Sequence, residues 1–448
     1  MMNTTYKTMV SELLREHVIS DEIGERIIHY YTSKKMQQAN RVLTIFAVFG
    51  SLLIGAGIIL MLAHNWDQFS KITKIGLSFA PMFIGYLLGG YILLKKKGIA
   101  WKESIAIFLS LAIGSNIAIL SQVYHIEGSI ASFLMGWILM VLPLLYVFNS
   151  HSVMLLIIGL NTYYGIAFGS YRPERIVHAP WAYLGVWISV LPFFIKTLRH
   201  QLQEHIRIAY GWLFSVSMLI TAWNFTYNVE VLGFVVYMSM FGLLYAIGNL
   251  DVFRKNQGFK NGSLAIGSIG TVFLLFFFSF EGSWEMFLDT HILTDRKKWN
   301  EIVHTREFTV ISIYSVLGIL IAGIQLVKKG ISNMSVLHPA CILFIGALGY
   351  TLYTGNTPII LINGYLLLLG GYFIKKGIDQ YKLGIANYGL LIISSLIICR
   401  FFDIEMTFIL RGVVFITIGI ILFITNYLLH IRQKKRIERL QEDHQSSE

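Results

Sequence analysis

The sequence predicts an all-α integral membrane protein, a polytopic bundle of about 14 transmembrane helices. Of its 448 residues, 55% are hydrophobic and only 14% are charged, whereas soluble domains carry about 25% charged residues. The mean hydropathy is +0.63, and apolar runs of membrane-spanning length recur along the whole chain. In lipid, only helices and closed barrels satisfy all backbone hydrogen bonds. These observations exclude most classes of soluble enzyme.

The first predicted element is an amphipathic helical hairpin that precedes the first apolar run. Apolar residues in this region repeat at helical spacing, and Ser20 is a suitable N-cap because the acidic residues Asp21 and Glu22 follow it in the first turn. The chain then divides into four predicted regions: the cytoplasmic hairpin at 1–41, a first transmembrane region at 42–170, further transmembrane helices at 171–430 with an outer loop at 281–307, and a basic cytoplasmic tail at 431–448.

Polar and charged clusters divide the apolar sequence into candidate spans. The predicted spans are 42–63, 75–94, 104–122, 130–148, 152–169, 181–196, 207–223, 231–250, 262–280, 308–327, 336–353, 358–374, 382–399 and 406–430. A weak internal repeat accompanies them, since the motif Gly89-Gly90-Tyr91 returns as Gly370-Gly371-Tyr372. Each motif is followed by a lysine-rich segment, so a parallel duplication would explain both copies.

The distribution of basic residues predicts the orientation in the membrane. If the N-terminus is cytoplasmic and the loops alternate, 26 of the 36 Lys and Arg residues lie on the cytoplasmic side, as the positive-inside rule requires. Both termini are therefore expected in the cytoplasm, and the protein is expected in the cell membrane. The net charge of +11 fits contact with anionic lipid at the cytoplasmic face, so it does not imply binding to nucleic acid.

The familiar catalytic and cofactor motifs are missing from the sequence. It has no Walker loop, no zinc-protease motif, no nucleophile elbow and no clustered Cys and His ligands. Cys341 and Cys399 both lie within apolar runs, where cysteine usually acts as a small buried hydrophobe. The sequence therefore predicts no cofactor and no metal, and it disfavours an enzyme.

Two polar clusters are expected at the outer ends of the first and third spans. Spans one and three run in the same direction, so the clusters reach the same surface and could face each other as a ligand-binding or proton-titrating site. The candidate outer-face residues are His64, Asn65, Trp66, Asp67, Gln122, Tyr124, His125 and Glu127. The alternative is structural: the aromatic residues form an interfacial belt, and Asp67 caps the helix that enters the second span.

Two further charged residues flank the last predicted outer loop. Arg400 and Arg411 bracket the acidic residues Asp403 and Glu405. Local ion pairing is one interpretation, and contact with an anionic substrate is the other.

The N-terminal third of the chain resembles a known family at several short motifs. These are Asn65-Trp66-Asp67 followed by Lys71 and Lys74, the run Gln122-Val123-Tyr124-His125, and the pairs Ile19-Ser20 and Tyr30-Tyr31. Together they are similar to bacterial predicted membrane proteins of domain of unknown function 2157, over roughly residues 10–170. The resemblance implies an integral membrane protein without an established reaction, and it favours the outer clusters as a site.

Three classes of function stay open on the sequence alone. A transporter or flippase of a small or lipid-like molecule fits the many spans and the scattered polar residues within them. A sensor or scaffold would use the cytoplasmic hairpin and tail as its output. A membrane-embedded transferase for a lipid-linked substrate would use the outer His, Asp and Glu residues as acid and base. The sequence identifies neither the substrate nor the oligomeric state.

Overall fold

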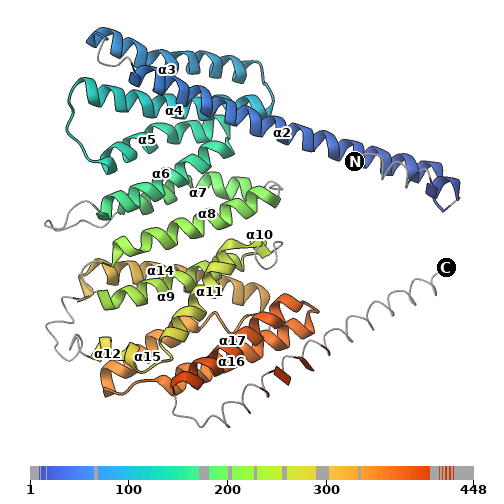
Figure 1. Cartoon of the computed structure of the whole chain (residues 1–448), viewed down its shortest axis with the longest axis vertical. Coiled ribbons are helices and arrows are strands. Elements are labelled where there is room, and N and C mark those ends of the chain that lie inside the picture. The colour runs from blue at the N-terminus through green and yellow to red at the C-terminus, as the bar shows by residue number, and fades with distance from the viewer. Residues whose placement is uncertain are drawn as a thin grey trace. The chain divides into compact units, whose positions relative to one another are not determined.

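The computed structural model describes most of the chain. The described residues are 10, 12–16, 18–64, 69–170, 181–199, 204–226, 230–254, 260–288, 302–330 and 334–403, with a few single positions between 413 and 427. Every regular element within these ranges is a helix, as Figure 1 shows. The predicted all-α class is therefore confirmed.

The chain divides into two compact units. The first contains α2 (Asp21–His64), α3 (Lys71–Leu94), α4 (Ile99–Val123), α5 (Ile130–Phe148), α6 (His151–Ser170) and most of α7 (Trp181–Arg199). The second contains α8 (Glu204–Ala222), the 3-10 helix η2 (Trp223–Phe225), α9 (Glu230–Gly248), α10 (Asp251–Arg254), α11 (Gly262–Phe277), α12 (Gly282–Leu288), α14 (Arg306–Lys329), α15 (Ala340–Thr354), α16 (Ile359–Asp379) and α17 (Leu383–Asp403).

Helix α4 is the centre of the first unit, where it packs against α2, α3, α5 and α6. Close approach depends on small residues: a Cβ added to Gly114 would lie 2.3 Å from the Trp137 ring of α5. The same indole donates from Nε1 to the carbonyl oxygen of Ser110 at 2.8 Å. Asn116 of α4 donates to the Ser78 hydroxyl of α3 at 3.1 Å, which is the bond between helices expected for an amide within a span.

Helix α2 joins the predicted hairpin to the first predicted span without a break. It runs for 44 residues from Asp21 to His64, although the sequence suggested separate elements on either side of residue 41. The reason is that neither Gly nor Pro occurs between Gly24 and Gly50, so nothing interrupts helical hydrogen bonding. Figure 1 shows the first half of α2 extending beyond the helices that pack on its second half.

Helix α9 is the centre of the second unit, where it packs against α8, α11, α14 and α15, while α16 and α17 pack closely against each other. Glycine again permits the contact: a Cβ on Gly267 of α11 would lie 2.5 Å from the backbone nitrogen of Tyr245 in α9. Buried hydroxyls link further helices, and Ser215 of α8 donates to Ser263 of α11 at 2.8 Å.

Eight described helices are long and apolar enough to cross a membrane. Shorter apolar helical stretches of 10–17 residues occur within α2 at Ile45–Ile54, and at Trp181–Thr197, Leu232–Gly248, Gly262–Phe277 and Ala340–Thr354. The predicted spans from 42–63 to 382–399 all overlap described helices, and most of the last one, 406–430, lies outside the described residues. The count of 14 spans and the orientation of the termini stay predictions.

The repeated motif has the same packing role in both units. An added Cβ on the first glycine of residues 89–91 would lie 3.0 Å from Phe148 Cζ, and one on the first glycine of residues 370–372 would lie 2.4 Å from Ile393 Cγ1. The second glycine of each motif has nothing within 4 Å. In both copies, therefore, one glycine faces a packed helix and its neighbour faces open space.

Candidate functional site

In the sequence, the two predicted outer clusters begin at the ends of two neighbouring helices, α2 and α4. Helices α2 and α4 pack against each other, and Figure 1 shows that they run in the same direction. Their last residues, His64 and Val123, therefore lie at the same end of the first unit. This is the arrangement that a shared site would need.

The cluster that closes α4 is exposed and forms the helix-ending turn. Gln122, Tyr124, His125 and Glu127 are all exposed. The backbone N–H of Ile126 donates to the carbonyl of Ser121 at 2.9 Å, and that of His125 donates to the carbonyl of Gln122 at 3.4 Å. His125 takes a left-handed conformation with φ 51°, as a residue that closes a helix in this way must. The turn gives this cluster a structural role.

The partner cluster lies mostly outside the described residues. These include neither Asn65, Trp66 and Asp67 nor the side chain of His64, so a contact between the two clusters stays a prediction. One structural alternative is wrong, however. The N-cap of α3 is Ser70, whose hydroxyl accepts from the Thr73 N–H at 3.2 Å; the helix begins too late for Asp67 to cap it.

Replacing His125 with glycine separates the structural role from a ligand-binding role. Glycine adopts φ 51° without the steric cost that histidine carries, so the variant is expected to gain about 0.5–1 kcal/mol in stability. Thermal unfolding in detergent measures this gain. If His125 also binds a ligand, the more stable variant should fail to restore the phenotype of cells from which the native protein has been deleted. Unchanged activity together with the gain in stability would remove His125 from the candidate site.

Arg400 binds the end of helix α11. Its Nη2 donates to the carbonyl oxygen of Ser279 at 2.6 Å and to the Ser279 hydroxyl at 2.9 Å, and its guanidinium lies 4.6 Å from the centre of the Phe280 ring. Asn363 of α16 donates to the same Ser279 carbonyl at 3.4 Å. A cation at this position stabilises the negative end of the helix dipole.

The other residues of the predicted cluster around Arg400 are not described in the structure. Arg411 and Glu405 lie outside the described residues, as does the side chain of Asp403. The predicted local ion pairs and the predicted anion contact at Arg411 therefore stay predictions. For Arg400, the contacts with Ser279 place the guanidinium between α17 and the end of α11.

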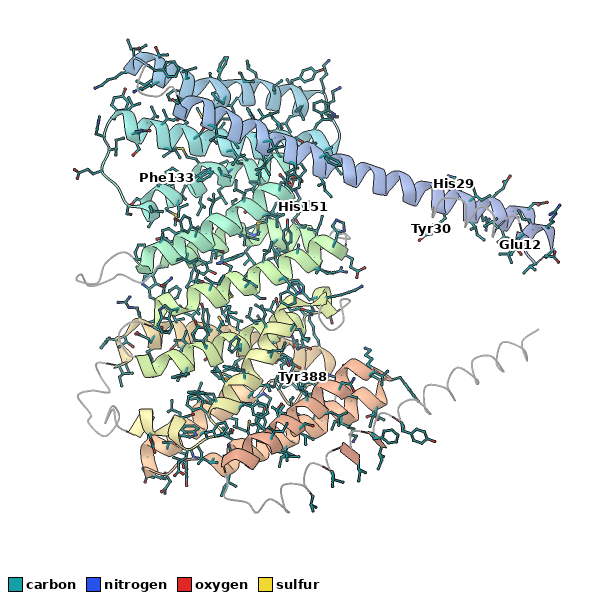
Figure 2. The ribbon with its side chains drawn as sticks, viewed as in Figure 1. Glu12, His29, Tyr30, Phe133, His151 and Tyr388 are labelled. Carbon is teal, nitrogen blue, oxygen red and sulfur yellow. The ribbon has the colours of Figure 1, made fainter. Side chains whose placement is uncertain are left out.

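Glu103 is a buried carboxylate that the sequence analysis missed. It is only 5% exposed and binds the first turn of α6: it accepts from the Ser150 hydroxyl at 2.5 Å, the His151 N–H at 2.8 Å and the Ser152 N–H at 2.9 Å. The acid thus caps a helix that follows it by nearly fifty residues in the chain. Figure 2 labels His151 at the start of that helix.

A local signal could have suggested this role. Glu103 is an acidic residue at the edge of an apolar span. Ser150 stands just before another apolar run, and residues 129–150 contain no Asp or Glu that could cap the start of that helix. The free N–H groups of a helix start need an acceptor. The sequence alone does not identify which distant side chain accepts these hydrogen bonds.

Metal binding finds no support among the described residues, where no group of three or more His, Cys, Asp or Glu side chains could hold an ion. Cys341 and Cys399 are both free thiols of intermediate exposure.

Part of the chain matches a known family. No curated protein and no solved structure matches the chain. The resemblance seen in the sequence is confirmed by the family comparison: residues 11–154 match the model of the family described as predicted membrane protein, DUF2157.

Proposed function

We propose that this protein transports a small or lipid-like molecule with an anionic group across the cell membrane. The observation that carries the proposal is the end of α11, where polar groups from three helices meet. Arg400 of α17 and Asn363 of α16 both donate to Ser279 there. Ionisable and amide side chains are costly within a bilayer, and they usually mark a functional pathway.

The length of α11 supports this interpretation. The helix has 16 residues, which at about 1.5 Å per residue is shorter than the roughly 30 Å of bilayer hydrocarbon. It therefore ends just short of the far side of the hydrocarbon layer. The predicted spans 262–280 and 382–399 would put this end, and Arg400 after the second span, at the outer side of the membrane. Backbone groups at helix ends contribute to substrate sites in many transporters, and Arg400 supplies a positive charge where an anionic headgroup would enter.

A transport assay with a defined lipid tests the proposal. The full chain is reconstituted into vesicles that contain a fluorescent phosphatidylglycerol, and dithionite added outside quenches the label that reaches the outer leaflet. We expect the wild-type protein to speed movement of this anionic lipid, and Arg400→Gln to slow it about tenfold, since a lost charged contact is worth at least about 1.4 kcal/mol.

The control is Leu391→Ala, which changes an exposed residue of the same helix and should leave the rate unchanged. Gel filtration verifies that each variant is folded. Equal rates for protein-containing and protein-free vesicles would overturn lipid transport. Equal rates for anionic and zwitterionic lipid would overturn the role proposed for Arg400.

A second candidate, a membrane sensor or scaffold, is favoured by the N-terminal hairpin. Leu14 of its first helix packs against Gly24 of α2, where an added Cβ would lie 3.0 Å from the leucine. Large apolar side chains of the hairpin nevertheless remain exposed, as for Val18 at 65% and Ile23 at 48%. Because α2 continues into the first predicted span, a partner on the hairpin would be joined to the membrane region by one helix.

The charge of the hairpin is divided along its length. Residues 12–26 contain five acids and two bases, whereas residues 27–41 contain three bases and no acid; Glu12 lies on the part of the chain that Figure 2 shows extending from the bundle. The acidic segment 12–26 is repelled by anionic lipid, so a basic segment of a cytoplasmic protein suits this part of the hairpin better than the membrane surface. A transferase would depend on the outer clusters and stays a prediction.

A further inference from the structure

A polar contact in the second unit joins α9, α14 and the turn that precedes α15. Its members are Gln325, 5% exposed near the end of α14, and His338 in the turn at residues 334–339. Gln325 Nε2 donates to the carbonyl oxygen of Ala246 in α9 at 2.7 Å. The contact therefore links α14, which the turn follows closely in the sequence, to α9, whose Ala246 is 79 residues before Gln325.

The contact with Ala246 fixes the orientation of the Gln325 side chain. A carbonyl oxygen only accepts hydrogen bonds, so the amide nitrogen of Gln325 must face it. The amide oxygen of Gln325 then points the other way and lies 3.3 Å from Nε2 of His338. The atom that faces this ring nitrogen is therefore an acceptor.

The other ring nitrogen of His338 also faces an acceptor. Its Nδ1 lies 3.1 Å from the backbone carbonyl oxygen of Ser335. A neutral imidazole carries one N–H and can donate to only one of these two oxygens, whereas the imidazolium carries two N–H groups and satisfies both. The neutral ring would hold one nitrogen lone pair against an oxygen lone pair.

We propose that His338 is a proton-binding site, and that the bound proton completes the link between α9, α14 and the turn before α15. With the proton, His338 donates to Ser335 and Gln325, and Gln325 in turn donates to Ala246. Loss of the proton as the pH rises breaks one of these bonds and loosens the turn.

The groups that surround His338 are compatible with a charged ring. The ring of Tyr245 in α9 lies 5.0 Å from the imidazole between ring centres, in an edge-to-face arrangement, and the hydroxyl of Tyr365 in α16 donates to the carbonyl of Val336 at 2.6 Å. Lys328, one turn after Gln325 in α14, is exposed. Within the described part of the chain, the titratable groups with contacts to this turn are thus Tyr245 and Tyr365, and aromatic rings attract cations.

Nitrogen NMR of the full chain tests the proton directly. The protein is labelled with ¹⁵N-histidine and purified in detergent, and a His338→Gln spectrum identifies the signals of this one histidine among 13. We expect both ring nitrogens of His338 to be protonated at about pH 6.5, where an ordinary imidazole is half protonated. His304, which is exposed, is assigned by His304→Gln and serves as the reference within the same sample.

Variants of the acceptor make the test specific to this contact. Gln325→Glu places a carboxylate against the ring and should move the pH of proton loss up by about 1 unit or more, whereas Gln325→Met removes the acceptor and should move it down. The His304 signals should move with neither variant. A neutral His338 ring at a pH where His304 is still charged would overturn the proposal, as would a titration that neither Gln325 variant shifts.

Discussion

Replacing Glu103 with leucine is expected to destabilise the first unit strongly, by about 3 kcal/mol. The carboxylate accepts hydrogen bonds from Ser150, His151 and Ser152 at the start of α6. Without it, these donors stay buried and unsatisfied, and the positive end of the α6 dipole loses its counter-charge. Thermal unfolding of the detergent-purified chain measures the loss.

Two further variants separate the cap from a general effect of removing an acid. Glu103→Gln keeps one acceptor oxygen and should recover part of the lost stability. Glu127→Gln removes an exposed acid beyond the other end of α4 and should cost less than about 0.5 kcal/mol. If Glu103→Leu unfolds at the same temperature as Glu127→Gln, the carboxylate does not hold the start of α6.

Hydrophobic runs predicted the helices well, because a span must be both long and apolar. Helix α3 ends at Leu94, the predicted end of its span, and the predicted span 130–148 coincides with α5. The sequence also identified Ser20 as the residue before the start of α2. Helix length, helix ends and N-caps depend on residues that are close together in the sequence, so the local sequence pattern is enough to predict them.

Contacts between distant segments could not be predicted in the same way. Glu103 is nearly fifty residues from the helix that it caps, and His338 is linked through Gln325 to Ala246. An acid or an amide within an apolar run signals that a partner exists, but the choice of partner depends on how the helices pack. The continuity of α2 was missed for a different reason: its polarity changes near residue 41, but its helical hydrogen bonding does not.

The repeated Gly-Gly-Tyr motif provides a matched pair of variants in one helix. In α16, a Cβ on Gly370 would lie 2.4 Å from Ile393 Cγ1 and 3.1 Å from the Gly389 carbonyl oxygen of α17, whereas one on Gly371 would meet nothing within 4 Å. Gly370→Ala should therefore force α16 and α17 apart and lower stability by about 1–3 kcal/mol.

Gly371→Ala should instead raise the stability of the protein. Alanine favours a helix over glycine by up to about 1 kcal/mol, and the added methyl group meets open space. The two variants have the same composition and differ by one position, so detergent and purification affect them equally. Thermal unfolding of both, with the wild type beside them, measures the difference.

The first copy of the motif predicts a smaller effect of the same kind. A Cβ on Gly89 would lie 3.0 Å from Phe148 Cζ, which is the far end of a side chain that can move, whereas the α16 contact includes backbone. Gly89→Ala should therefore cost less than Gly370→Ala, while Gly90→Ala should match Gly371→Ala. Equal effects at Gly370 and Gly371 would contradict the packing of α16 on α17, because only that packing makes the two glycines different.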